Sequence, residues 1–263
     1  MNNTVNKAIS ILQLLAKNSS GLTLAEISRI LNIPKSSAFD LVHTLENRGF
    51  VEAIDNRLKN YKLGVEAFCV GQAYLHGTSI EVIANPILSE LREETDETVF
   101  MSMPVAKADL VYTMKFSPRA SAIKMAYSVG DTRPLLSLGM GKAILAAHSD
   151  QEVAEIMEGY DYGTSSISSI TDLTSLTYFL NLSRMQGFVR DSTSENGGYA
   201  SPVAAPILGL NRKVIGAISI VIMKNAESDA KVYEMGKMVQ QTALNISRKL
   251  GFVEDDLYIR SRS

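Results

Sequence analysis

The chain has 263 residues, of which 46% are hydrophobic and 21% are charged. This composition excludes an intrinsically disordered chain, and the length favours two domains over one. A net charge of −2 excludes a uniformly polybasic protein, but residues 1–63 carry eight basic and five acidic side chains, whereas the remainder is acidic. A small basic head on an acidic body indicates a nucleic-acid-binding module joined to a second domain.

The cysteine and apolar patterns restrict the compartment and the chemistry. Cys69 is the single cysteine, so no internal disulfide can form, which fits a reducing compartment. With only three scattered histidines besides, we expect neither a metal nor another cofactor. The longest apolar stretch, Val214–Met223, is about half as long as a membrane span. Polar residues interrupt the apolar positions of residues 5–16, unlike a signal peptide, so we expect a soluble cytoplasmic protein without a membrane partner.

The first 63 residues have the pattern of a winged helix-turn-helix. Apolar spacing predicts three short helices followed by two strands, over residues 5–16, 24–31, 34–49, 50–53 and 58–63. Thr23 stands three residues before Glu26, as in a capping box, and Pro34 suits the first turn of the third helix. Because only a short turn joins the second and third helices, they form a helix-turn-helix, and the two strands form its wing.

The third helix is the predicted recognition helix, whose N-terminal residues reach DNA bases and phosphates. Lysine can bind phosphate or guanine, serine hydroxyls can donate to either, and cations at the hairpin tip can contact a neighbouring groove. We predict DNA contacts from Thr23, Lys35, Ser36, Ser37, Phe39, His43, Arg57 and Lys59. The positive surplus is small, so a dimer that reads an inverted repeat is expected. A winged helix that binds protein instead is the alternative.

The remaining residues alternate helical and strand-like patterns. Helical spacing covers residues 80–95 and also 65–75, which we interpret as a linker helix with Cys69 on its packed apolar face. Strands are predicted at residues 98–103, 110–116, 188–191, 203–208 and 214–223. Further helices are predicted at residues 139–147, 150–158, 172–186 and 226–250. A loop rich in glycine and proline is expected at 130–134, and a frayed tail from residue 254. Antiparallel strands with helices around them predict an α+β second domain.

Short sequence blocks along the chain carry a family resemblance. In the head they are Asn6-Lys7-Ala8-Ile9, Leu24-Ala25-Glu26-Ile27, Ile33-Pro34-Lys35-Ser36-Ser37-Ala38 and Gly49-Phe50. In the body they are Gly139-Met140-Gly141-Lys142-Ala143-Ile144, Gly187-Phe188-Val189-Arg190-Asp191, Ala204-Ala205-Pro206-Ile207 and Val214-Ile215-Gly216-Ala217-Ile218-Ser219-Ile220. Together, and in this order over about residues 4–250, they resemble the IclR family of bacterial transcriptional regulators. Each block alone is weak, but their ordered combination is specific.

The resemblance implies a domain plan. It comprises a winged helix-turn-helix DNA-binding domain over residues 1–63, a linker helix over 64–78, a GAF-like effector-binding domain over 79–252 and a polar tail over 253–263. It also implies homodimers or tetramers, no catalysis, and control of a catabolic operon by repression or activation. The implied effector is a small molecule, most often an organic acid or an aromatic compound.

The resemblance also places the effector. It implies contacts from Gly139 and Met140 at a helix start, from Asp191 at a strand end, and from Ser219 and Val221 on a strand. Free N–H groups at a helix start suit a carboxylate, and glycine lets a ligand approach the backbone, which supports the first of these. Each of these residues also has an ordinary structural explanation. Gly139 is a glycine at a helix start, Asp191 is a residue that forms turns, and Ser219 is a buried serine that bonds to a neighbour.

Three departures from the family pattern stand out. Asp40 occupies a position where the family often has arginine, so a different operator preference is expected. Several relatives carry a second hydroxyl where Val221 stands, which predicts a more apolar pocket here. The segment between Asp191 and Ala204 is about one residue longer than in some relatives.

We therefore predict a ligand-responsive transcriptional regulator, a repressor of a catabolic operon. It is expected to bind a palindromic, double-stranded operator as a dimer and to sense a small organic acid. A ligand-free architectural or protein-binding winged-helix module is the alternative. An enzyme is not expected, because Gly139–Ala143 fails as a phosphate loop, no nucleophile elbow or zinc-protease motif occurs, and the histidines are dispersed.

Overall fold

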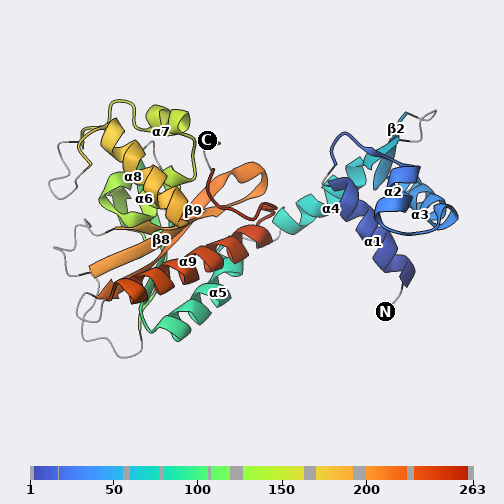
Figure 1. The fold of residues 1–263 in the computed structure, drawn as a ribbon. Coiled ribbons are helices and arrows are strands. Elements are labelled where there is room, and N and C mark those ends of the chain that lie inside the picture. The colour runs from blue at the N-terminus through green and yellow to red at the C-terminus, as the bar shows by residue number, and fades with distance from the viewer. Residues whose placement is uncertain are drawn as a thin grey trace. The chain divides into compact units, whose positions relative to one another are not determined.

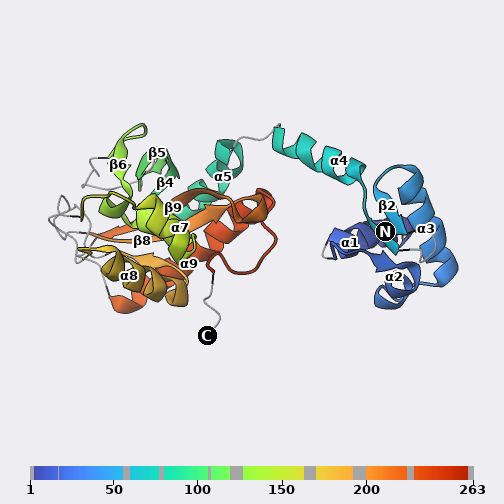
Figure 2. The ribbon, with the colours of Figure 1, turned by 90° about the horizontal axis from the view of Figure 1, so that it is seen from above.

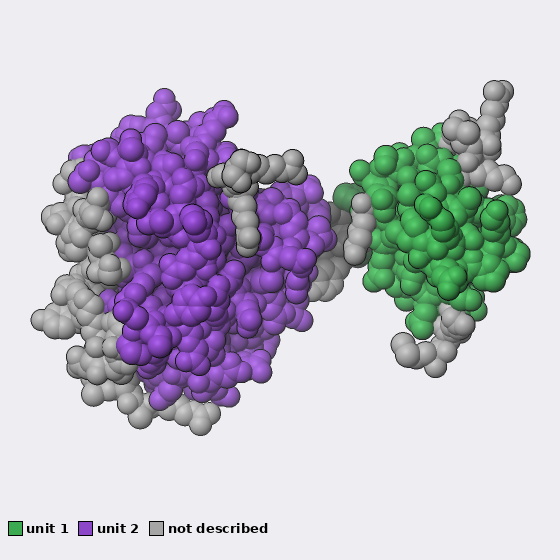
Figure 3. Space-filling view, in the orientation of Figure 1, with its two compact units in different colours: residues 1–79 green, residues 80–263 purple. Residues whose placement is uncertain are grey.

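The computed structural model describes residues 3–16, 18–55, 60–76, 80–105, 108–118, 127–162, 170–191, 200–223 and 228–259. The chain divides into two compact units, residues 1–79 and 80–263, which we describe separately (Figure 3). Within the described ranges, no helix is long and apolar enough to cross a membrane.

Within its described residues, unit 1 has four helices and a small sheet (Figure 1). Its elements are α1 (Asn3–Ala16), β1 (Leu22–Thr23), α2 (Leu24–Ile30), α3 (Lys35–Asn47), β2 (Val51–Asp55), β3 (Asn60–Leu63) and α4 (Val65–His76). The antiparallel strands have the order β1-β3-β2. Buried side chains of α1, α2 and α3 meet those of the hairpin in one small core, and the predicted helix-turn-helix with a wing is the arrangement found.

The turn between α2 and α3 fixes the orientation of α3 relative to α2. Thr23 caps α2: its Oγ accepts from the Glu26 N–H at 3.3 Å, and the Glu26 carboxylate accepts from the Thr23 N–H at 2.8 Å. These hydrogen bonds hold the pKa of Glu26 below its usual value. Asn32 adopts φ +51° in the turn, and the buried Ser28 hydroxyl donates to the Ile33 carbonyl at 2.7 Å. The turn is therefore held by both backbone and side chains.

The described residues of unit 2 form an antiparallel sheet of six strands, on which this unit is built. Its strands are β4 (Thr98–Pro104), β5 (Asp109–Phe116), β6 (Thr132–Pro134), β7 (Val189–Arg190), β8 (Ala200–Leu208) and β9 (Val214–Met223). The order is β6-β5-β4-β9-β8-β7, and Figure 2 shows the run from β6 to β8. β8 is buried along its whole length, and β9 pairs with it on one side and with β4 on the other, so these strands form the centre of the core.

Helices cover both faces of the sheet (Figures 1 and 2). They are α5 (Ile80–Thr95), the single-turn η1 (Leu135–Ser137), α6 (Gly139–Ala146), α7 (Asp150–Ile156), α8 (Leu173–Gln186), the single-turn η3 (Leu210–Arg212) and α9 (Asp229–Lys249). α5 and α9 lie side by side on one face, and α6 packs on the other with α8 against it. Every residue of α6 is buried, so this short helix is enclosed between the sheet and the outer helices.

Three sequence expectations are wrong. The predicted loop at 130–134 contains β6, because the backbone of Leu110 and Val111 pairs with it. The tail is not frayed over residues 254–259: Leu257 and Tyr258 are buried, and the Arg212 guanidinium donates to the Leu257 carbonyl at 2.9 Å. Cys69 is exposed rather than packed, because α4 is held at its first turn and leaves its apolar residues uncovered within unit 1.

Candidate functional site

Several of the predicted DNA contacts lie in the first turns of α3, the helix labelled in Figure 1. Lys35, Ser36, Phe39 and His43 are exposed, and Ser37 is half-buried. Phe39 and His43 are four residues apart, and their rings stack with centroids 5.9 Å apart. The residue before the helix is Pro34, which supplies no side-chain cap. The first N–H groups of α3 are therefore available to an anion.

The other predicted DNA contacts have different surroundings. The Thr23 hydroxyl is committed to the capping box, because it also donates to the Glu26 carboxylate at 2.7 Å. Arg57 and Lys59 lie outside the described residues. Asp40 is exposed on α3, and its backbone carbonyl accepts from the Thr44 hydroxyl at 2.7 Å. The helix thus carries a carboxylate on its surface one turn beyond Lys35.

In unit 2, a narrow cavity lies between the start of α6 and the sheet. It is lined by Phe100, Tyr112, Tyr127, Leu138, Gly139, Met140, Pro202, Ser219 and Val221. These include four of the five predicted effector contacts, brought together from α6 and β9. The cavity holds about 20 Å³, which is room for about one water molecule. It is a small, largely apolar space.

Polar groups in this narrow cavity are few. The N-cap of α6 is Leu138, which provides no side-chain hydrogen bond, so the N–H groups of the first turn are uncapped. Ser219 is buried on β9, between Phe100 of β4 and Ala204 of β8. Its hydroxyl donates to no residue of the described ranges. Tyr112 stacks on Tyr127 at 5.3 Å and forms an aromatic wall. A small anion with an apolar body suits this set of groups.

Asp191 lies beside the narrow cavity and does not line it. Its carboxylate accepts from the Lys142 ammonium at 2.9 Å, and neither side chain is more than 1% exposed. The Lys142 ammonium also lies over the Phe179 ring, 5.7 Å from its centre. A Cβ placed on Gly139 would stand 3.1 Å from the Asp191 Cβ, so Asp191 directly supports the first turn of α6.

Sequence reasoning missed Lys142. The pattern assigns it no role beyond a family block and a failed phosphate loop, although it is the one charged residue in the apolar stretch Leu135–Ala147. Its isolation among apolar residues could have indicated a buried ion pair, because a lone lysine in a buried helix requires a buried partner. The identity of that partner, Asp191, could not be predicted from the sequence, because 49 residues separate the two side chains.

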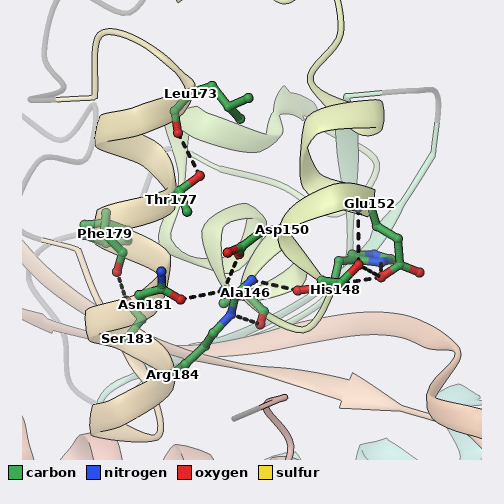
Figure 4. A network of polar contacts seen from close by, with 11 residues as sticks. Ala146, His148, Asp150, Glu152, Leu173, Thr177, Phe179, Asn181, Ser183 and Arg184 are labelled. Carbon is green, nitrogen blue, oxygen red and sulfur yellow. Dashed lines mark hydrogen bonds and ion pairs between the residues drawn. The ribbon is translucent and has the colours of Figure 1, made fainter. Parts of the chain in front are cut away.

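The other end of α6 is fixed by Arg184 of α8 (Figure 4). The guanidinium donates to the carbonyls of Ala146 at 3.0 Å and His148 at 2.7 Å, and to the Asp150 carboxylate at 2.6 Å. It also donates to the Asn181 side-chain oxygen at 2.7 Å. One buried cation therefore satisfies the carbonyls at the end of α6 and joins that end to α7 and α8.

Comparison with known proteins decides the family. Residues 4–55 match the IclR helix-turn-helix domain, and residues 72–248 match the C-terminal domain of the bacterial transcriptional regulator IclR. The chain belongs to the IclR family. The proposed fold class is thereby confirmed: an N-terminal winged helix-turn-helix followed by an α+β, GAF-like effector-binding domain.

Members of the IclR family similar to this chain are named as regulators. XynR of Escherichia coli is 28% identical over 250 residues, covering 95% of this chain and 97% of XynR. KipR of Bacillus subtilis is 28% identical over 251 residues, covering 95% and 98%. As a member of this family, the chain is a DNA-binding transcriptional regulator and not an enzyme.

Solved structures of the IclR family have the same fold. An IclR-type regulator from a Silicibacter species superposes with a TM-score of 0.84 at 19% identity, covering 98% of this chain and 100% of that chain. The repressor BlcR of Agobacterium tumefaciens superposes with a TM-score of 0.76 at 22% identity, covering 97% and 99%. At these identities the likeness concerns the fold alone.

Proposed function

We propose that the chain is a cytoplasmic repressor of a catabolic operon, that it binds a palindromic operator as a homodimer through α3, and that it senses a small organic acid at the start of α6. Residues 1–63 would bind DNA, residues 64–78 would link, and residues 79–252 would hold the effector. The observation that carries this proposal is the exposed, uncapped start of α3 with Lys35 beside it.

The DNA part rests on charge and exposure. Lys35 and Ser36 stand at the positive end of a 13-residue helix, where the helix dipole and free N–H groups favour phosphate. Phe39 and His43 form a stacked pair on the next turns, suited to contacts with base edges and thymine methyl groups. Arg57 and Lys59 are proposed to contact DNA from the hairpin, and Thr23 from the start of α2.

The dimer part rests on an uncovered apolar surface. On α4, Val65 is 68% exposed, Phe68 62% and Val70 55%, with Cys69 between them. Large apolar side chains in this density on one helix favour association, and a second copy of α4 offers the same surface. We propose that two copies pair there, so that two α3 helices read two half-sites. Phe68→Glu should then convert dimers into monomers in sedimentation velocity, whereas Glu66→Gln should leave them intact.

The sensor part rests on the narrow cavity. The uncapped N–H groups of Gly139 and Met140 suit a carboxylate. The Ser219 hydroxyl, which donates to none of the described residues, suits a second polar atom of the same ligand. Val221 and Tyr127 would contact its apolar portion. Entry requires the flexible Met140 side chain to move, because the cavity holds only about 20 Å³. Asp191 would act through Lys142 and Gly139 in positioning the helix.

The small volume also favours a second candidate function. A cavity that holds one water is what a ligand-free architectural regulator would have. Such a protein would bind its operator with an affinity that no metabolite changes. A ligand-responsive protein would instead bind its operator more or less tightly when the ligand is present. The change in operator-binding free energy is at most the difference between the ligand's binding free energies for the two conformations of the protein, typically about 1–3 kcal/mol.

One experiment tests the DNA part. An operator is first selected from random-sequence duplexes with the full chain and then titrated in gel shifts at several salt concentrations. Lys35→Ala should weaken binding and reduce the salt slope by about one unit. Arg48→Ala, at the opposite end of the same helix, is the matched control and should change little. Equal affinities for wild type and Lys35→Ala would overturn the placement of α3 on DNA.

A thermal-shift screen of the full chain tests the sensor. The probes are 2-oxobutyrate, gluconate, succinate and benzoate. A stabilising hit that is lost in Ser219→Ala supports the proposed effector site. A folded protein that no probe stabilises, and whose operator affinity no probe changes, supports the architectural candidate instead.

A further inference from the structure

A second and much larger cavity lies in unit 2, at the opposite end of α6. Its volume is about 490 Å³, within the range of sites that bind small molecules. It is lined by residues of β4, η1, the end of α6, α7, the turn between β8 and β9, and the segment after α9. None of these residues lines the narrow cavity, and the proposed function assigns no role to this space.

The cavity has an apolar body. Leu135, Ile144 and Ala147 come from η1, α6 and the residue after it, and all three are buried. Ile156 adds the end of α7, and Val214 adds the start of β9. The aliphatic side chains come from both sides of the cavity, so a compact apolar group entering it would be removed from water on several sides.

The walls are preformed. Arg184 holds the carbonyl of His148 and the carboxylate of Asp150 in place, which fixes the α6–α7 corner (Figure 4). On the other side, Asn211 and Arg212 adopt φ +54° and +59° in the turn between β8 and β9. Two consecutive non-glycine residues in this region require firm support from their surroundings. A ligand would therefore meet a rigid site.

Among the described residues, the polar rim carries two permanent cations, Arg212 and Lys213. The two terminal nitrogens of Arg212 are committed, because they pair with Glu254 and donate to the carbonyls of Asp256 and Leu257, while the guanidinium lies over the Phe252 ring; only its buried Nε has no partner in the described residues. Lys213 follows it, is exposed, and makes no ion pair or hydrogen bond through its side chain within the described part of the chain. Lys213 is thus the cation that a ligand anion can pair with.

The remaining polar groups define where such an anion would lie. The Glu152 carboxylate is held by the Ser149 N–H and hydroxyl at 2.8 and 2.7 Å, on the α7 side of the rim. His148 lies beside it, with Nδ1 3.9 Å from the Glu152 carboxylate. An anion would avoid Glu152 and face Lys213 and the Asn211 amide, while the apolar part of the ligand fills the space towards Ile144 and Ile156.

We propose that this cavity is a second small-molecule site, and that it binds a monocarboxylate with a compact apolar body, its carboxylate paired with Lys213. The site is built from unit 2 alone. It shares no lining residue with the narrow cavity, so it takes a different molecule, or a second copy of the same one, from the proposed effector site.

The test is a titration of the full chain with benzoate, followed through the ¹³C-labelled methyl groups of isoleucine and methionine. Ile144, Ile156 and Ile259 report on this cavity, and Met140 reports on the narrow one. Benzoate should shift the three isoleucine signals with one dissociation constant. Benzyl alcohol, which has the same ring without the charge, should bind about fivefold more weakly.

Three variants make the test specific. Lys213→Gln should weaken benzoate about fivefold without affecting benzyl alcohol, because an exposed cation contributes modestly. Val214→Phe, at a half-buried position of the wall, should abolish binding of both. Lys249→Gln, which makes the same charge change at an exposed position that lines neither cavity, is the matched control and should leave both affinities unchanged. Since Lys213 is exposed, its variant keeps the test valid even where Val214→Phe is poorly folded.

The outcomes separate this proposal from the proposed function. Benzoate shifts confined to Met140 and abolished by Ser219→Ala would support the effector site and overturn the second site. If the isoleucine signals gave the same benzoate affinity for Lys213→Gln as for the wild type, the proposed pairing of the carboxylate with Lys213 would be overturned. A weak site would have a dissociation constant of about 1 mM. If about 20-fold more benzoate than that produced no shift of the isoleucine signals, the proposal would be overturned outright.

Discussion

The Lys142 ammonium and the Asp191 carboxylate lie 2.9 Å apart, with no more than 1% of either side chain exposed. They connect two parts of the chain that are 49 residues apart, α6 and the end of β7. The pair lies directly beneath Gly139, so it holds the helix start that lines the narrow cavity. Removing either charge takes from the other, which stays buried, the opposite charge it is paired with, and this is far costlier than losing an exposed pair.

Lys142→Met should lower the free energy of unfolding of unit 2 by about 3–5 kcal/mol. The double variant Lys142→Met with Asp191→Asn should recover part of this loss, because no uncompensated charge remains. Urea unfolding followed by near-ultraviolet dichroism of the tyrosines measures both. Lys213→Met, at an exposed position, is the control and should cost little. A double variant no more stable than the single one would show that the coupling is not electrostatic.

Gly141→Ala should destabilise unit 2 by about 3 kcal/mol. A Cβ at this position would stand 2.0 Å from the Leu135 carbonyl oxygen, and that backbone atom belongs to the turn that precedes α6. Gly130→Ala is the matched control, because a Cβ there meets nothing within 4 Å. Its cost should be about 1 kcal/mol, from the φ of +95° alone. Equal costs in urea unfolding would contradict the close approach of η1 to α6.

Tyr258→Phe should leave the stability of unit 2 within about 1 kcal/mol of the wild type, or raise it. The Tyr258 hydroxyl is buried and has no hydrogen-bond partner among the described residues, and burial raises its pKa. Removing a buried hydroxyl without a partner relieves a desolvation cost, whereas Tyr258→Ala removes the ring and should cost about 3–5 kcal/mol. A large loss in Tyr258→Phe would reveal a partner for the hydroxyl.

The stability of unit 2 should fall as the pH is lowered through 6.5. The pKa of His148 is held below its ordinary value of 6.5, mainly because burial disfavours the charged imidazole. Glu152 opposes this shift, and Arg184 adds to it. The unfolded chain therefore takes up the proton first, so the native state loses stability below about pH 6.5 and is unaffected by this group well above it.

His148→Asn should flatten this pH profile between pH 7 and 5, as measured by urea midpoints at fixed ionic strength. Glu152→Gln provides the opposing control, because it removes the charge that raises the His148 pKa. That variant should therefore steepen the decline. Identical profiles for wild type and His148→Asn would exclude His148 as the source.

Most elements of the chain were predictable because their signals are local. The Thr23–Glu26 capping box starts α2 where the spacing placed it, and the apolar run of residues 214–223 gives β9. What the sequence lacked was long-range pairing. β6 lies in a segment that resembles a loop, and it becomes a strand only because β5 supplies hydrogen-bond partners. Leu257 and Tyr258 look like part of a polar tail until the unit 2 core covers them.

The candidate sites show the same division. The exposed start of α3 follows from local helix signals, so Lys35 and its neighbours could be identified in advance. Four of the predicted effector residues meet at one cavity, but their choice depended on family resemblance and not on spacing. The larger cavity escaped prediction altogether. Its walls come from segments up to 155 residues apart, and no local pattern marks such a convergence.

The position of Cys69 has a practical consequence. It is the single thiol of the chain and is exposed on α4, the helix that precedes the second unit. A maleimide reagent would therefore react once per polypeptide, without any engineered cysteine. Because Cys69 lies within the proposed α4 pairing surface, pairing of two copies should slow this reaction, and their dissociation should restore it. Measured with operator, with effector and with both, the rate of thiol labelling would follow the regulatory response through a natural residue.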